Sequence, residues 1–234
     1  MQQVSVAGST ESPAAEPLNA QAASDGLADL QRRERKKRQT RHALLRAALA
    51  LFMDKGYDHT AVREITDAVD ISERTFFRYF ANKEDLVLSF ARDITSELMR
   101  ELAARPAAEP PFTALRAAFR AAVTTLAAER DAEAGESVYP SIIRLIDSTP
   151  ALMAAHMRYT HECDEEIAKV LAEREGIDPA TDRRPWCAAA VFDSLLHVTC
   201  REWQEEDSGT VEDMLATFDS YCEHTAGALS GHWT

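Results

Sequence analysis

The 234-residue chain has few of the features that mark secreted, membrane or metal-binding proteins. Its four cysteines are widely spaced and form no CxxC pair, which argues against a disulfide framework or a zinc ribbon. No apolar run approaches the roughly 18 residues of a membrane-spanning helix. The first residues lack the basic start and apolar stretch of a secretory signal. We therefore expect a cytoplasmic protein with reduced thiols and no membrane partner.

Motifs of the common enzyme classes are also missing. There is no GxxxxGK[ST] phosphate loop, no GxSxG elbow and no dinucleotide-binding glycine run. The nearest approach to a metal site is the run from His161 to Glu165, with His156 before it, and a solvated charged face is the favoured interpretation. A redox sensor built on one cysteine stays an alternative, although no basic group is placed to activate a thiol. We predict no enzyme activity, no metal and no cofactor.

Charge is distributed unevenly along the chain, whose net charge is −13. Residues 1–30 contain four acids and no Lys or Arg, residues 31–92 contain 14 basic against 9 acidic residues, and residues 93–234 contain 12 against 26. Only the surface that touches a polyanion must be positive. The pattern indicates a basic head on an acidic body.

The head is preceded by two segments of contrasting composition. Residues 1–30 are rich in small and polar residues, which predicts a disordered tail. The next segment carries eight basic side chains within fifteen residues, namely Arg32, Arg33, Arg35, Lys36, Lys37, Arg38, Arg41 and Arg46. A solvated helix face is one interpretation. We favour an arm that contacts DNA phosphates or the minor groove, because these charges would otherwise repel one another.

Apolar residues at helical spacing then predict two helices of the head. The first runs from Gln39 to Lys55, and Gly56 stands where a left-handed C-cap belongs. The second is short, from Ala61 to Val69, with Thr60 as its predicted N-cap.

Two further helices follow a break at residues 70–72. Ser72 is a suitable cap for a helix from Glu73 to about Tyr79. Asn82 caps a longer helix whose apolar stripe ends before Arg105. Later helices are predicted near 112–130, 137–148, 150–175, 183–206 and 210–229, so the fold is expected to be all-α with about nine helices.

The sequence GYDHTAVREITDAVDISERTFFRYFANKEDL, residues 56–86, is similar to the TetR family of bacterial regulators. That family shares a G-Y/F-x-x-T…I-A…A-G-V-S…Y-x-H/Y-F-x-x-K-E-x-L pattern, and the resemblance extends over residues 39 to about 92. It implies a three-helix DNA-binding domain over residues 31–92, with its reading helix in the major groove, and a ligand-sensing and dimerisation domain over residues 93–234.

The chain departs from this pattern at two positions. Asp70 stands where glycine is usual in the turn, and Asp tolerates left-handed geometry better than most residues. Phe77 stands where tyrosine is usual, which removes a hydroxyl and leaves an apolar edge that could meet a thymine methyl.

Chemistry and resemblance together select the DNA contacts. Arg74 and Thr75 could reach base edges, and Arg78 could reach a base or a phosphate. The resemblance implies phosphate contacts by Tyr79 and Lys83. An ordinary solvent-exposed role is the alternative for each residue taken singly. The predicted contacts are Arg38, Arg41, Thr60, Ser72, Arg74, Thr75, Phe77, Arg78, Tyr79 and Lys83.

The acidic body is expected to sense a small molecule and to form a homodimer through the last two helices, although their apolar residues could instead pack only within one chain. A mainly apolar pocket with one or two cationic anchors would suit an amphipathic or acyl-type effector. The candidate ligand contacts are Phe119, Tyr139, Ile143, Arg144, His156 and Met157. The resemblance implies a repressor that leaves a palindromic double-stranded operator when the effector binds.

Overall fold

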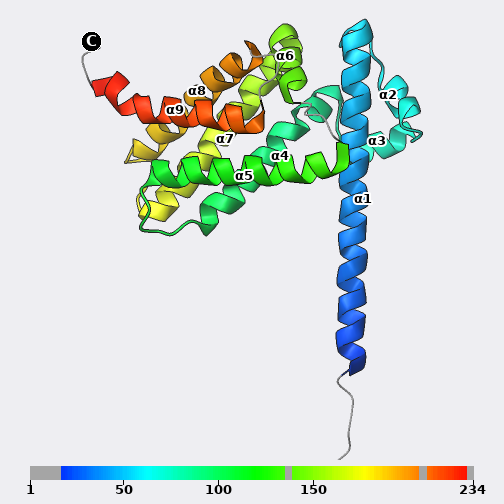
Figure 1. Ribbon diagram of the computed structural model, residues 1–234, viewed down its shortest axis with the longest axis horizontal. Helices are drawn as coiled ribbons and strands as arrows, with labels where there is room; N and C mark the ends of the chain where they lie inside the picture. Colours follow the sequence, from blue (N-terminus) through cyan, green and yellow to red (C-terminus); the bar gives the residue numbers. More distant parts are fainter. Residues whose placement is uncertain (1–16, 135–138, 206–209, 231–234) are drawn as a thin grey trace, which may run out of the picture. The chain divides into compact units, whose positions relative to one another are not determined.

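The computed structural model describes residues 17–134, 139–205 and 210–230, which contain nine α-helices and no strand (Figure 1). The helices are α1 (Pro17–Lys55), α2 (Val62–Ala68), α3 (Glu73–Tyr79), α4 (Lys83–Ala104), α5 (Pro111–Ala134), α6 (Tyr139–Ser148), α7 (Pro150–Glu175), α8 (Arg184–Glu205) and α9 (Val211–Ser230). The predicted all-α class is confirmed. Within these ranges no helix combines the length and apolar character needed to cross a bilayer. The chain divides after Ala43 into two units, described separately below.

The first unit holds residues 17–43 of α1, and here the structure differs from the predicted disordered tail over residues 1–30. Residues 1–16 lie outside the described part of the chain, whereas residues 17–30 are helical. Proline suits the first helical position, because its fixed φ fits the helix and its missing N–H has no helical partner there. Once the helix has nucleated, each added residue costs little. The alanine-rich segment can therefore extend α1 without an apolar period.

In the second unit, the end of α1 packs inward through its predicted apolar stripe. The buried side chains are Leu44, Leu45, Ala48, Leu49 and Phe52. Gly56 follows the helix with a φ of +89°, and its N–H donates to the Phe52 carbonyl at 2.9 Å. The Tyr57 ring packs back on the Phe52 ring, with centroids 5.0 Å apart. The predicted left-handed cap is confirmed.

A tight turn joins α2 to α3. Asp70 has a φ of +53°, so it adopts the left-handed geometry expected of it. The N–H of Ile71 donates to the Thr66 carbonyl at 3.1 Å, which closes the end of α2. Ile65 and Thr66 are buried on the inner side of α2. The turn therefore sets the direction in which α3 leaves the core.

Helix α4 connects this head to the rest of the second unit. Its first turn is capped as predicted, because the Asn82 side chain accepts a hydrogen bond from the Asp85 N–H at 2.7 Å. Five successive residues, 86–90, are buried, so the helix is covered on all sides at this level. Farther along, α4 packs against α5 and α7.

The far end of α4 is held by Arg174 of α7. One guanidinium nitrogen donates to the carbonyls of Leu102 and Arg105, at 3.0 and 2.9 Å, and the other donates to the Pro106 carbonyl at 2.9 Å. The last carbonyls of a helix have no partner within it. Arg174 therefore supplies the hydrogen bonds that the end of α4 lacks.

Three aromatic rings join α5, α8 and α9 in the core of the body. Phe119, Phe192 and Phe218 are all buried, and their centroids lie 5.0–5.6 Å apart in edge-on arrangements. Such contacts add about 0.5–1.5 kcal/mol per pair beyond area burial. The triad fixes how these three helices pack.

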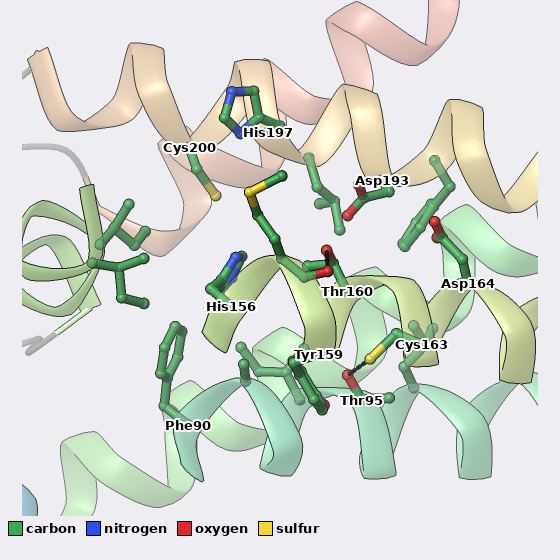
Figure 2. Close-up of a pocket in the computed structure, with 18 of the residues that line it drawn as sticks. Phe90, Thr95, His156, Tyr159, Thr160, Cys163, Asp164, Asp193, His197 and Cys200 are labelled. Atoms are coloured by element: carbon green, nitrogen blue, oxygen red, sulfur yellow. Dashed lines mark hydrogen bonds between the residues drawn. The ribbon is translucent and has the colours of Figure 1, made fainter. Parts of the chain in front are cut away.

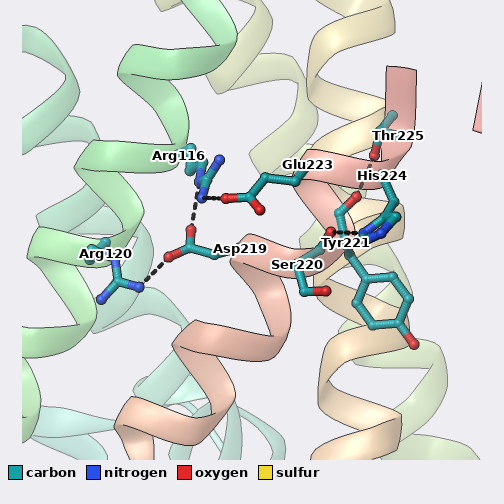
Figure 3. Close-up of polar contacts among 8 residues, drawn as sticks. All are labelled: Arg116, Arg120, Asp219, Ser220, Tyr221, Glu223, His224 and Thr225. Atoms are coloured by element: carbon teal, nitrogen blue, oxygen red, sulfur yellow. Dashed lines mark hydrogen bonds and ion pairs between the residues drawn. The ribbon is translucent and has the colours of Figure 1, made fainter. Parts of the chain in front are cut away.

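A polar network lies between α5 and α9 (Figure 3). The Asp219 carboxylate accepts hydrogen bonds from Arg116 and Arg120, and Arg116 also donates to Glu223 at 3.0 Å. The pKa of Arg116 is raised, chiefly by its hydrogen bond to Asp219. Two arginines of the acidic body are therefore occupied in holding its helices together.

We expect Asp70→Val to lower the free energy of unfolding by about 1–2 kcal/mol, because a branched Cβ is disfavoured at positive φ. Asp70→Gly, which removes the Cβ, should change it by less than about 1 kcal/mol. Urea unfolding followed by circular dichroism measures both. A valine variant as stable as the glycine variant would contradict the left-handed turn.

Candidate functional site

Helix α3 has a buried side and an exposed side. Ser72 caps it, since its hydroxyl accepts from the Thr75 N–H at 3.2 Å. Phe76 and Phe80 are buried in the head, with ring centroids 5.6 Å apart, as predicted. These contacts anchor one face of the helix. The opposite face is free to meet a partner.

The exposed face carries most of the predicted base-reading side chains. Arg74 and Arg78 are exposed, and 53% of Phe77 is accessible, which is unusual for so large an apolar residue. Thr75 and Tyr79 are half-buried at its edges. Positions 74, 77 and 78 share one side of a helix because residues three and four apart are neighbours. The fold therefore brings these side chains together.

Arg78 also contacts its neighbour. Its guanidinium lies 5.1 Å from the Tyr79 ring centroid and donates to the Tyr79 hydroxyl at 3.4 Å. Stacking on an aromatic ring restricts the guanidinium and presents its remaining N–H groups outward.

The side chains of Thr60 and Lys83 donate hydrogen bonds to backbone carbonyls within the head. The N-cap of α2 is Ala61, so the predicted N-cap role of Thr60 is wrong. The Ala61 N–H donates to the Glu64 carboxylate at 2.8 Å, while Thr60 is 2% exposed and its hydroxyl donates to the Gly56 carbonyl. A glutamate at the third helical position commonly reaches back to the N–H of the N-cap residue in this way.

The Lys83 ammonium donates to the carbonyls of Tyr57 and Thr60, at 2.8 and 2.9 Å. It also lies 4.4 Å from the Tyr57 ring centroid. These contacts tie the start of α4 to the turn before α2. A phosphate contact by Thr60 or Lys83 stays a prediction.

The arm residues Arg38 and Arg41 belong to the first unit. Arg38 is exposed and Arg41 is half-buried on α1. Their contact with DNA stays a prediction.

A cavity of about 450 Å³ lies within the helical body (Figure 2). Helices α4 to α8 line it, mainly with apolar side chains. These include Phe90, Ile94, Leu98, Phe119, Ile143, Ile146, Met153, Met157, Ile167, Phe192 and Leu196. Its size lies in the range of small-molecule pockets.

Four of the six predicted ligand contacts line this cavity. They are Phe119, Ile143, His156 and Met157. Arg144 is exposed and is not part of the lining, so its assignment there is wrong. It follows Ile143 on α6, and neighbouring helical residues point in different directions. The Tyr139 side chain lies outside the described residues.

The polar lining differs from the expected cationic anchors. Among the residues that line the cavity there is no Lys or Arg, and the polar groups are Thr95, His156, Tyr159, Thr160, Cys163, Asp164, Asp193, His197 and Cys200. Burial, and then the nearby charge of Asp193, raise the pKa of Asp164 to about 6. Burial also lowers the pKa of His156. The expectation of a cationic anchor is therefore corrected: the cavity presents carboxyl and imidazole groups.

Both the DNA-binding region and the helical body match models of known protein families. Residues 44–90 match the family model for bacterial regulatory proteins of the tetR family, and residues 109–225 match the MftR C-terminal domain. The HTH-type transcriptional regulator TcmR of Streptomyces glaucescens is 37% identical over 204 residues, which cover 86% of this chain and 89% of TcmR. The chain belongs to the TetR family. It is a DNA-binding transcription regulator and not an enzyme.

Other TetR relatives are more distant. The putative mycofactocin biosynthesis transcriptional regulator MftR of Mycobacterium tuberculosis is 28% identical over 186 residues, 79% of this chain and 90% of that protein. Thermus thermophilus FadR, solved with lauroyl-CoA, aligns with a TM-score of 0.44 at 21% identity, covering 83% of this chain and 97% of FadR. A putative TetR-family regulator from Mesorhizobium loti aligns with a TM-score of 0.48 at 21% identity. The alignment covers 85% of this chain and 99% of that chain.

Sequence reasoning missed the contribution of α8 to the cavity of this TetR-family chain. Asp193, Leu196, His197 and Cys200 all line it. Their spacing of three and four residues places them on one helix face, and that spacing was visible in the sequence. Asp164 was assigned to a solvated face, but it also lines the cavity.

Metal and redox chemistry find little support in the TetR body. The described part of the chain holds no group of three or more His, Cys, Asp or Glu side chains arranged for a metal ion. Burial raises the pKa of the Cys163 thiol, that of Cys200 to about 12 and that of Cys222 to about 11. Thiols with raised pKa values react slowly, because the thiolate is the nucleophile. Cys187 is exposed.

We expect Lys83→Met to lower the free energy of unfolding by about 1–3 kcal/mol, because two part-buried carbonyls lose a charged donor. Lys169→Met is the matched control. Its ammonium is 3.8 Å from Glu165 on an exposed helix face, and such pairs contribute less than about 1 kcal/mol. Urea unfolding of both variants gives the comparison. Equal stability losses would argue against an internal role for Lys83.

Proposed function

We propose that the chain is a repressor that binds a palindromic operator as a homodimer and leaves it when a small amphipathic molecule occupies the cavity. The observation that carries this proposal is the position of α4. Its first residue is tied to the head by the Lys83 hydrogen bonds, and Phe90, Ile94 and Leu98 line the cavity. One rigid element therefore touches both the DNA-reading head and the ligand site.

The exposed face of α3 supports the DNA-binding half of the proposal. Arg74 near the start of α3 can donate two parallel hydrogen bonds to a guanine edge, and Phe77 offers an apolar surface to a thymine methyl. Arg78 and Tyr79 lie farther along, where a base or a phosphate is within reach. The buried Phe76 keeps these side chains on a fixed scaffold.

Coupling requires that the effector bind better to a conformer in which the two heads are wrongly spaced for DNA. A ligand shifts an equilibrium only by its difference in affinity for the two states. A molecule that pushes against Phe90 or Ile94 acts directly on α4. This supports release of the operator on ligand binding.

The outer faces of α8 and α9 support a homodimer. These helices pack on each other in one chain. Trp203, Leu215 and Phe218 are buried, so they serve the core of a single chain. Among the exposed positions, beside charged side chains and Trp186, are four small side chains, Ala190 and Ser194 on α8 and Ala216 and Ser220 on α9. A second copy can approach closely over such residues, and an HTH protein needs two half-sites for specificity.

The DNA-reading role of Arg74 is tested by Arg74→Ala. We expect it to weaken binding to the operator by about 1–3 kcal/mol while changing affinity for a random duplex much less. Fluorescence anisotropy at fixed salt, on the duplex protected in a footprint of the DNA upstream of the gene, measures both affinities. Arg100→Ala is the control, because Arg100 pairs with Glu97 and Glu101 on α4. Equal losses on both duplexes would remove base reading by Arg74.

The homodimer is tested by Ala190→Arg, which places a charged, bulky side chain on the outer face of α8. We expect sedimentation velocity at micromolar concentration to show a dimer for the unchanged chain and a monomer for this variant. Ala103→Arg changes an exposed alanine of α4 and should leave the dimer intact. A dimer that survives Ala190→Arg would place the interface elsewhere.

A further inference from the structure

Two carboxyl groups face the cavity with only imidazoles near them as countercharges among the described residues, His156 and His197 near Asp193 and His161 near Asp164. Asp164 of α7 and Asp193 of α8 both line it, and neither accepts a hydrogen bond or forms an ion pair there. Partly buried polar groups in proteins are nearly always satisfied by protein or water. Carboxylates left facing a mainly apolar cavity are therefore the groups for which a ligand can supply hydrogen bonds.

The charge of a ligand group that would complement these carboxylates follows from the charges around them. The lining contributes no Lys or Arg, and its remaining titratable groups are imidazoles, thiols and a phenol. The nearby cation Arg92 is already paired with Asp85 at 3.3 Å and lies 5.3 Å from the Tyr159 ring centroid. An ionised carboxylate only accepts hydrogen bonds. A ligand head group that donates, and carries positive charge, is complementary to this end of the cavity.

The titration behaviour of the lining agrees with this sign. Burial raises the pKa of Asp193 as well as that of Asp164, because the charged form of each carboxyl is poorly solvated. His156 and His197 are the imidazoles that face Asp193, and burial lowers the pKa of His156. A bound cation would relieve the cost of ionising the two carboxyls, whereas a bound anion would add to it.

The two carboxyl groups lie on one side of a mainly apolar lining. Figure 2 shows Asp164 of α7 and Asp193 of α8 on one side of the cavity, His156 and Cys200 on the other, and Thr160 between them. Phe119 and Phe192 meet edge to face, with centroids 5.5 Å apart, and supply aromatic surface to the same cavity. An aromatic body can lie against these rings.

We propose that the cavity binds an amphipathic organic cation, with a protonated amine held by Asp193 and Asp164 and an aromatic body packed against Phe119 and Phe192. Only the statement that this molecule is the effector depends on the function proposed above. Binding itself does not depend on DNA. An amphipathic cation therefore takes the place of the expected acyl-type effector with cationic anchors, because the two aspartates would repel an anionic ligand.

Three probes with one aromatic body and different head groups test the charge preference. They are 1-pyrenemethylamine, 1-pyrenemethanol and 1-pyreneacetic acid, titrated into the full chain at pH 7.5 and followed by pyrene fluorescence. We expect the amine to bind about tenfold or more tightly than the alcohol, and the acid to bind most weakly. Equal affinities, tightest binding of the acid, or no binding of any probe would overturn the proposal.

Asp193→Asn tests whether the carboxylate itself is responsible, because asparagine keeps the shape and removes the charge. We expect it to weaken the amine about tenfold and to leave the alcohol nearly unchanged, which also shows that the cavity is intact. Asp164→Asn should act in the same direction. Glu162→Gln, on the exposed side of α7, is the matched control and should change neither probe. An amine affinity unaffected by both aspartate variants would overturn the proposal.

Operator release is measured separately, by adding the amine probe to the protein–DNA complex in the anisotropy assay. Release by the amine and not by the acid supports the cation as effector. If the amine binds in the expected order but releases no DNA, the assignment of the cavity stands and the release mechanism proposed above fails. If the three probes bind without the expected order while operator binding is intact, the assignment of the cavity to a cation fails and the proposed DNA-binding function is unaffected.

Discussion

The arrangement of the second unit depends on the burial of α4 where the head meets the body. Residues 86–90 are buried in succession, so at this level the helix has no solvent-facing side and cannot turn about its own axis without breaking contacts. Side chains that pack at the density of a crystal shift between discrete arrangements and do not deform smoothly. The Lys83 ammonium fixes the start of the helix to the head, and the Arg174 guanidinium fixes its end to α7. The helix is thereby held at three places: by Lys83 at its start, by the apolar packing of residues 86–90, and by Arg174 at its end.

Local signals in the sequence were sufficient for most of the fold. The caps at Ser72 and Asn82 and the left-handed residues Gly56 and Asp70 act over a few residues, so their chemistry can be recognised without knowledge of the tertiary structure. The Thr60 cap failed because the helix begins one residue later, after Ala61, and the Thr60 hydroxyl donates to the Gly56 carbonyl. The helical extension at residues 17–30 was missed because helix growth from an existing nucleus needs no apolar face.

The site was predictable only in part, because its two regions differ in origin. The exposed face of α3 comes from seven consecutive residues, and helical spacing was enough to group Arg74, Phe77 and Arg78. The cavity is assembled from five helices, and its chemistry depends on which side chains converge. Asp164 and Asp193 are 29 positions apart and sit among many acids in the body, most of them solvated. Helical spacing could have grouped Asp193 with its neighbours on α8, but nothing in the sequence pairs it with Asp164, whereas the fold brings both to one cavity.

The Arg174 clamp has a mechanical consequence. Three hydrogen bonds hold the C-terminal end of α4 and the following turn, so in the release mechanism proposed above this end would be the fulcrum about which the helix swings. At 1.5 Å per residue, Ile94 lies about 13 Å from the fulcrum and Lys83 about 30 Å. A displacement imposed at the cavity would therefore be roughly doubled where α4 enters the head. In that mechanism α4 would act as a lever, and Arg174 would contribute to regulation without touching either ligand or DNA.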